Sequence, residues 1–89
     1  MNRRARQTLG ALFTRPVLAG VRWSSIESLI RALGGDVSEG AGSRVRFHLN
    51  GRKAVFHRPH PERETNRSTV RDVCDFLESA GVSPEDDGI

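Results

Sequence analysis

Cysteine is nearly absent from this sequence, since Cys74 is the only one among 89 residues. A single thiol cannot form an internal disulfide, which favours a reducing compartment and a cytoplasmic protein. Cys74 falls in an apolar repeat at helical spacing, which is typical of a small core side chain rather than a nucleophile. Long apolar runs are also absent. The run from Leu9 to Phe13 has five residues, fewer than the roughly 7–15 of a signal peptide or the roughly 20 of a membrane span.

Motifs of several common active sites are missing too. There is no Cys/His pair at zinc spacing and no glycine-rich phosphate loop, and the acidic residues form no pattern typical of a metal site. We therefore expect neither a metal nor a cofactor. A Ser43 nucleophile with His57 as its base lacks an evident acidic residue to orient the histidine, so the sequence does not favour it.

The charge is modestly basic and unevenly distributed. The formal net charge is +3 at pH 7, and acidic residues gather near the C-terminus at Glu85, Asp86 and Asp87. The first residues and the central part of the chain are left basic. This distribution indicates an anionic partner, of which nucleic acid is the most common.

The central stretch, residues 42–61, predicts a β-hairpin. Asn50-Gly51 is the strongest short-range signal for a type I′ turn, because both central positions of that turn need positive φ. The turn pairs residues 44–49 with residues 52–57, so that Arg44 lies opposite His57. Alternation then places apolar side chains on one face, namely Val45, Phe47, Leu49, Ala54 and Phe56. The other face is basic apart from Val55 and carries Arg44, Arg46, His48, Lys53 and His57.

Two amphipathic helices flank this hairpin. In the first, Ser24 and Glu27 match a capping box, and the apolar stripe consists of Ile26, Leu29, Ile30 and Leu33. Gly34-Gly35 ends it. The second helix begins near Asn66 or Ser68 and ends at Gly81, with a stripe of Val70, Val73, Cys74 and Leu77.

Two other segments leave alternatives open. Trp23 is either a core anchor beside the first helix or a base-stacking side chain. The basic N-terminal segment predicts a short helix over about Arg4–Phe13, which is either a loosely ordered arm that docks one apolar turn or an arm that contacts nucleic acid.

The order of these elements predicts an α+β fold. Residues 36–39 favour a short first strand, which gives helix, three strands and helix. The economical packing is a three-stranded antiparallel sheet with two helices on one face, preceded by the helical leader. We expect one shared core containing Leu29, Ile30, Phe47, Phe56, Val73 and Leu77. The opposite face of the sheet stays open.

An open face of arginine, lysine and histidine suits one kind of chemistry. Cationic side chains bind phosphates, and a histidine near neutral pH can accept or donate a proton. Together these are the requirements of RNA cleavage without a metal. The competing interpretation is a solvated basic face with no chemical role.

Four short motifs follow one another along the chain. They are Trp23-Ser24 at the start of the first helix, Gly42-Ser43 before the first strand of the hairpin, Pro59-His60-Pro61 after its second strand, and residues 76–82 at the end of the second helix. In this combination the chain resembles the HicA family, the toxins of bacterial toxin–antitoxin pairs. The resemblance covers roughly residues 21–82, which leaves a basic leader (1–20) and an acidic tail (83–89). It implies a fold like double-stranded-RNA-binding domains, metal-independent cleavage of mRNA, and a hetero-oligomer with a HicB-type antitoxin.

The family pattern continues Gly-Ser with a catalytic histidine, whereas Gly42-Ser43 is followed here by Arg44. An arginine can bind phosphate but cannot act as a base. We expect His57, directly across the hairpin, to take that role, with His60 as a second candidate and Arg44 beside them. The predicted RNA contacts are Ser43, Arg44, Arg46, His48, Lys53 and Arg58. The alternative is a binding module of the same fold that cleaves weakly or not at all.

Overall fold

The computed structural model describes residues 1–59 and 64–84. In chain order its elements are α1 (Arg3–Leu12), β1 (Val21–Arg22), α2 (Trp23–Ala32), β2 (Asp36–Glu39), β3 (Arg44–Leu49), β4 (Arg52–His57), β5 (Glu64–Thr65) and α3 (Arg67–Ser79). The predicted α+β fold is confirmed. His60 and most of the predicted acidic tail, residues 85–89, lie outside the described residues.

The central sheet has the order β2-β3-β4 and is antiparallel throughout. The hairpin register is the predicted one, with Arg44 opposite His57 and Phe47 opposite Ala54. Asn50 and Gly51 both have positive φ, 51° and 80°, as a type I′ turn requires. The turn residues and the alternation of apolar and polar side chains were therefore sufficient to predict the register of the hairpin.

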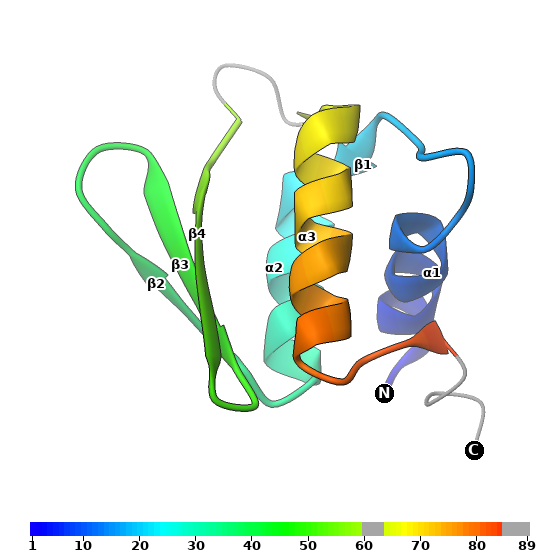
Figure 1. Cartoon of the computed structure of the whole chain (residues 1–89), viewed down its shortest axis with the longest axis horizontal. Helices are drawn as coiled ribbons and strands as arrows, with labels where there is room; N and C mark the ends of the chain where they lie inside the picture. The colour runs from blue at the N-terminus through cyan, green and yellow to red at the C-terminus, as the bar shows by residue number, and fades with distance from the viewer. Residues whose placement is uncertain (60–63, 85–89) are drawn as a thin grey trace.

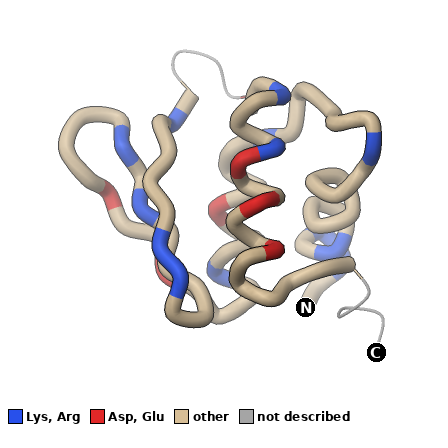
Figure 2. Tube along the Cα trace, viewed as in Figure 1, with Lys and Arg blue, Asp and Glu red and all other residues tan. Residues whose placement is uncertain are grey.

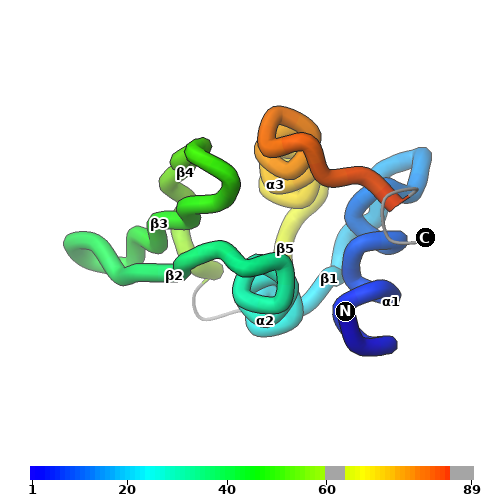
Figure 3. Tube along the Cα trace, turned by 90° about the horizontal axis from the view of Figure 1, so that it is seen from below, coloured from blue at the N-terminus to red at the C-terminus, as the bar shows by residue number. Residues whose placement is uncertain are grey.

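Helices α2 and α3 lie side by side on one face of the sheet, as predicted, and α1 packs against both of them on the side away from the sheet (Figures 1 and 3). The molecule thus has three layers: sheet, helix pair and single helix. The other face of the sheet is covered by no described element.

A cluster of aromatic rings fills the space between the sheet and the helix pair. The ring centroid of Phe47 lies 5.6 Å from Trp23, 5.2 Å from Phe56 and 6.3 Å from Phe76. All six residues predicted to share the core are buried. Trp23 retains 4% of its accessible surface, which confirms it as a core anchor and excludes base stacking by its ring.

The basic leader is a structural part of the core. Asn2 caps α1 through its side chain, which accepts a hydrogen bond from the Ala5 amide at 2.8 Å. Ala5, Leu9 and Leu12 are buried at the positions i, i+4 and i+7, a continuous stripe rather than one docked turn. The picture of a loosely ordered arm is therefore wrong, because α1 covers apolar surface of α2 and α3.

We expect Leu12→Ala to reduce the free energy of unfolding by about 2–5 kcal/mol, because Leu12 is fully buried and its loss leaves a cavity. Leu18→Ala is the matched control, since Leu18 is 42% exposed and should change stability by less than about 0.5 kcal/mol. Urea unfolding of both variants measures the difference. If Leu12→Ala lowered the free energy of unfolding as little as Leu18→Ala does, α1 would not contribute to the core.

The predicted capping box of α2 is wrong. The helix begins two residues earlier than a Ser24 cap implies, at Trp23, and its N-cap residue Arg22 makes no side-chain capping bond. The Glu27 carboxylate does not turn back to the helix start, because it accepts hydrogen bonds from the Trp23 indole and the Arg58 guanidinium. In α3 the prediction holds, since the Asn66 side chain accepts from the Thr69 amide at 2.9 Å.

A second, two-stranded sheet was not predicted. Val21 pairs with Thr65, and Arg22 pairs with Glu64, which brings opposite charges across from each other. Each strand has two residues, too few to show a side-chain alternation in the sequence. The pairing holds the starts of α2 and α3 together.

Candidate nucleic-acid interface

The open face of the central sheet consists of three rows of exposed side chains that run across the strands. Pairing of the strands gives the rows as Asp36, His48 and Lys53; Ser38, Arg46 and Val55; and Arg44 with His57. Figure 2 shows the positive charge along β3 and β4, whereas the exposed acidic residues of the helix pair lie largely on α3. We call this surface the open face from here on.

Arg44 and His57 are the residues that the structure brings together at one end of the open face. Directly opposed Cβ atoms in an antiparallel pair lie about 4.5–5.5 Å apart. The backbone on both sides of the pair is held: the Gly40 amide donates to the Arg44 carbonyl at 2.9 Å, and the Arg58 amide donates to the Ser43 carbonyl at 2.8 Å. A cation and an imidazole therefore stand side by side on a fixed backbone, and Arg46 follows on the same side of β3.

His48 and Lys53 belong to the other end of the open face. They lie four residues along the strands from the Arg44–His57 pair, which corresponds to about 13 Å at the usual rise per residue. His48 and His57 are therefore too far apart to act on the same phosphate. Lys53 and His48 form a separate group of basic side chains at that end of the open face.

Asp36 is a residue of the open face that sequence reasoning missed. Strand β2 places Asp36 directly beside His48. Asp36 is the one carboxylate in the three rows, and it lies at the end of the face near the Asn50-Gly51 turn. The register of β2 against β3 depends on the turn at residues 40–43, where Gly42 has φ +65°. The sequence of that turn does not specify which residues pair.

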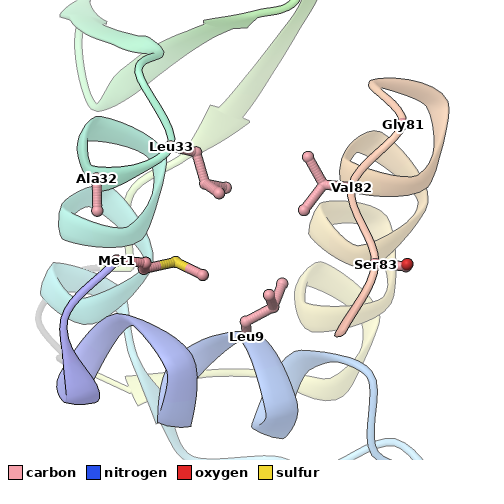
Figure 4. Close-up of a pocket in the computed structure, with 7 residues that line it drawn as sticks. All are labelled: Met1, Leu9, Ala32, Leu33, Gly81, Val82 and Ser83. Atoms are coloured by element: carbon pink, nitrogen blue, oxygen red, sulfur yellow. The ribbon is translucent and has the colours of Figure 1, made fainter. Parts of the chain in front are cut away.

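Two hollows elsewhere differ in chemistry from the open face, and one of them is lined by Arg4 and Arg22 but by no imidazole. Figure 4 shows an open hollow of about 430 Å³ lined by Met1, Leu9, Ala32, Leu33, Gly81, Val82 and Ser83, which include no acidic, basic or imidazole side chain. Within residues 1–59 and 64–84, no group of three His, Cys, Asp or Glu side chains is arranged to hold a metal ion. None of the described helices is long and apolar enough to cross a membrane.

Comparison with known protein families shows to which family the chain belongs. A family model described as the HicA toxin of bacterial toxin–antitoxin systems matches residues 23–82, about two-thirds of the chain. The chain belongs to the HicA toxin family. It is accordingly a toxin of a toxin–antitoxin system, which implies an antitoxin partner. No curated protein matches it, and no solved structure does.

The match contains α2, the central sheet and α3 but not α1, so α1 is an addition to the part that defines a HicA toxin here. The resemblance noted above between this family and the Gly-Ser segment concerns residues 42–44. In the structure these residues lead into β3, and Arg44 occupies the position next to His57 on the open face. Among the histidines that the structure describes, His57 is therefore the one that lies next to the Gly-Ser segment of this HicA toxin.

Arg58 was predicted to contact RNA, but its side chain lies on the helix side of the sheet. It follows Ala54 and Phe56 in the alternation of β4, and its guanidinium bonds Glu39 at 2.6 Å and Glu27 at 3.1 Å. Hydrogen bonds to Glu39 and Glu27 raise the pKa of Arg58 above its ordinary value. The alternation of side chains along β4 puts residue 58 on the same side as Ala54 and Phe56, so the sequence alone could have predicted this orientation.

Proposed function

We propose that this HicA toxin is an endoribonuclease that cleaves mRNA on the open face without a metal ion. The observation that supports the proposal most is the Arg44–His57 pair beside Gly42-Ser43, on a surface that is exposed and basic. Arginine supplies a permanent cation for phosphate, and a neighbouring imidazole supplies a proton acceptor. These two groups are sufficient to begin attack by a ribose hydroxyl.

In the proposed reaction His57 takes the proton of a ribose 2′-OH, and the 2′-oxygen forms a bond to the adjacent phosphorus. The bond from phosphorus to the 5′-oxygen of the next nucleotide breaks, which leaves a 2′,3′-cyclic phosphate. Arg44 stabilises the extra negative charge on the phosphorane. The departing 5′-oxygen takes its proton from water, which reaches this open surface. Imidazolium then returns its proton to solvent.

RNA affinity should rest on the cationic side chains of the open face. Arg44 and Arg46 are two residues apart on β3, so they point the same way about 6.5 Å from each other along the strand. Lys53 extends the cationic surface toward the hairpin end. A single RNA strand lying along β3 would bring successive phosphates to these side chains.

We expect Arg46→Ala and Lys53→Ala each to weaken RNA binding and to make the slope of log K against log salt shallower by about 0.7, the effect of one lost phosphate contact on a single strand. Arg31→Ala on α2 removes the same charge from an exposed helical position and is the matched control. Fluorescence anisotropy with a labelled RNA at several salt concentrations measures the slopes. Identical changes in all three variants would show that only net charge matters.

The proposal extends to the partner. A HicB-type antitoxin would neutralise the toxin by covering the open face with acidic or hydrogen-bonding groups over Arg44, Arg46 and His57. The exposed Val55, in the middle row of that face on the edge strand β4, offers an apolar contact for the same partner. A complex that leaves these side chains exposed to solvent would contradict this mode of inhibition.

One observation keeps a second function open: Arg44 stands where the family pattern has its histidine, and arginine cannot act as the base. The second candidate is therefore an RNA- or partner-binding module that does not cleave. Purified protein incubated with a long RNA in excess chelator separates the two. Fragments ending in cyclic phosphate support the endoribonuclease, whereas bound but intact RNA supports the binding module.

A further inference from the structure

We propose that Glu27 is a positioning residue for RNA cleavage, which acts through Arg58 to hold the end of β4, and with it His57, against Arg44. The inference rests on the proposed function, because it concerns the residues assigned to the reaction. Glu27 lies on α2, on the helix side of the sheet, and the candidate base lies on the open face. The connection between them passes through one residue of the chain, Arg58.

Glu27 is held where it can act as a fixed acceptor. Its Oε2 atom accepts a hydrogen bond from the Trp23 Nε1–H at 2.6 Å and two from Arg58, from Nη2 at 3.1 Å and from Nε at 3.4 Å. Trp23 itself is buried and stacked on Phe47, so its indole cannot move freely. The Glu27 side chain is 13% exposed, which reduces solvent screening of its bonds.

Arg58 transmits this restraint to the candidate site. Its guanidinium bridges Glu27 of α2 and Glu39 at the end of β2, and its backbone amide donates to the Ser43 carbonyl at 2.8 Å. One residue therefore fixes the chain immediately after His57 and the carbonyl immediately before Arg44. The next residue, Pro59, has no amide hydrogen with which to continue the ladder.

The restraint matters because the pair stands at the end of the hairpin away from the Asn50-Gly51 turn, and His57 lies on an edge strand of the sheet. Strand β4 has a hydrogen-bonded neighbour on one side only, β3. On the β4 side, the hydrogen bonds that the described residues make beyond His57 are those of the Arg58 amide and the Arg58 guanidinium. A displacement of about 1 Å of a catalytic group can lower a rate by about 100-fold.

The competing explanation is that these bonds only stabilise the fold. The two explanations differ in kinetics. A loss of folded protein lowers the apparent concentration of active enzyme, and correcting for the folded fraction restores kcat. A misplaced base lowers kcat of fully folded protein and leaves KM unchanged, because the phosphate contacts of Arg46 and Lys53 lie elsewhere on the open face.

The test is Glu27→Gln, which keeps the side-chain shape and an acceptor oxygen for the Trp23 indole but removes the charge that holds Arg58. We expect kcat for RNA cleavage in chelator to fall by about 10–100-fold, with KM little changed and melting temperature showing a folded protein. Glu78→Gln on the exposed side of α3 is the matched control and should keep the activity of the parent.

Arg58→Lys is the second variant, since a lysine keeps the charge but cannot bond two carboxylates as a guanidinium fork does. Its loss of kcat should match that of Glu27→Gln, and the double variant should be no slower than either single one, as residues acting through the same contact require. Independent losses that multiply, or unchanged kcat in folded Glu27→Gln, would overturn the inference. So would a fall in activity accounted for by unfolded protein.

A readout that does not depend on cleavage separates this inference from the proposed function. Hydrogen exchange of the Arg58 amide should become faster in Glu27→Gln, whereas amides in the middle of β3 should stay protected. If the parent protein does not cleave RNA, the proposed function fails, and this exchange alone decides whether Glu27 holds the end of β4. An unchanged Arg58 amide would overturn the inference in either case.

Discussion

Replacing His57 with alanine is expected to reduce RNA cleavage by about 10²–10⁴-fold, the usual contribution of a positioned proton-transfer group. The reason is geometric: His57 stands directly across from Arg44, beside the Gly42-Ser43 segment, and is exposed on the open face. RNA affinity should change little, because the proposed phosphate contacts are made by Arg44, Arg46 and Lys53. Initial rates on a labelled RNA in chelator, with affinity measured separately, give both quantities.

His48→Ala is the control within the same face. His48 lies about 13 Å along the strands from His57, so its loss should leave the chemical step nearly intact. Wild-type activity in His57→Ala, combined with a large loss in His48→Ala or His60→Ala, would place the base at the hairpin tip or near the two prolines instead.

Arg44→His supplies the opposite test of the same pair. The change restores the Gly-Ser-His pattern of the HicA resemblance at a position whose backbone is already fixed by hydrogen bonds to Gly40 and Ala41. We expect higher cleavage activity in this variant, together with weaker binding from the lost permanent charge. An inactive Arg44→His would show that the surrounding surface no longer supports a base at that position.

Replacing Phe47 with alanine is expected to lower the free energy of unfolding by about 3–5 kcal/mol, the range for a buried aromatic residue truncated to alanine. Phe47 is fully buried and contacts the rings of Trp23, Phe56 and Phe76, so its loss opens a cavity at the centre of the core. The whole stability of a small domain is about 5–15 kcal/mol. The variant should therefore be marginally stable, which urea unfolding measures.

Val55→Ala is the control on the same sheet. Val55 is 55% exposed on the open face, next to Arg46 rather than the core, and its truncation should cost less than about 0.5 kcal/mol. A larger loss of stability for Val55→Ala than for Phe47→Ala would mean that the two faces of the hairpin are assigned the wrong way round.

The parts of this fold that could be predicted are those specified by residues close together in the chain. The Asn50-Gly51 turn determines the β3–β4 register, and alternation along the two strands determines which face is buried. The apolar stripes of α2 and α3 likewise show their buried sides at a spacing of three and four residues. From these elements the open face and the Arg44–His57 pair followed directly.

The parts that could not be predicted depend on contacts between distant residues. Glu27 resembles a capping residue by its spacing from Ser24, but it bonds Arg58, 31 residues away, because a charged guanidinium forms stronger hydrogen bonds than a neutral amide. Asp36 joins the open face only through the register of β2. The β1–β5 pair is too short to be visible in any local pattern.

Helix α1 shows a third kind of difficulty. Its apolar stripe was visible in the sequence, but its partner surface is formed by α2 and α3 together, which lie next to each other only in the folded chain. Gly10 also weakens the helical signal, since glycine lowers helix propensity. In the structure a Cβ at Gly10 would meet nothing, so the position is exposed and its glycine costs only local helix stability.

The most direct test of the central claim is a ¹H–¹⁵N NMR titration of the wild-type protein with an RNA oligomer whose 2′-hydroxyls are methylated, so that it binds but cannot be cleaved. Binding on the open face predicts that the largest shift changes fall on β3 and β4, centred on Arg44, Arg46 and His57, while α1 and α3 change little. Shift changes confined to the helices, with the open face unchanged at saturation, would contradict the claim that this face binds and cleaves RNA.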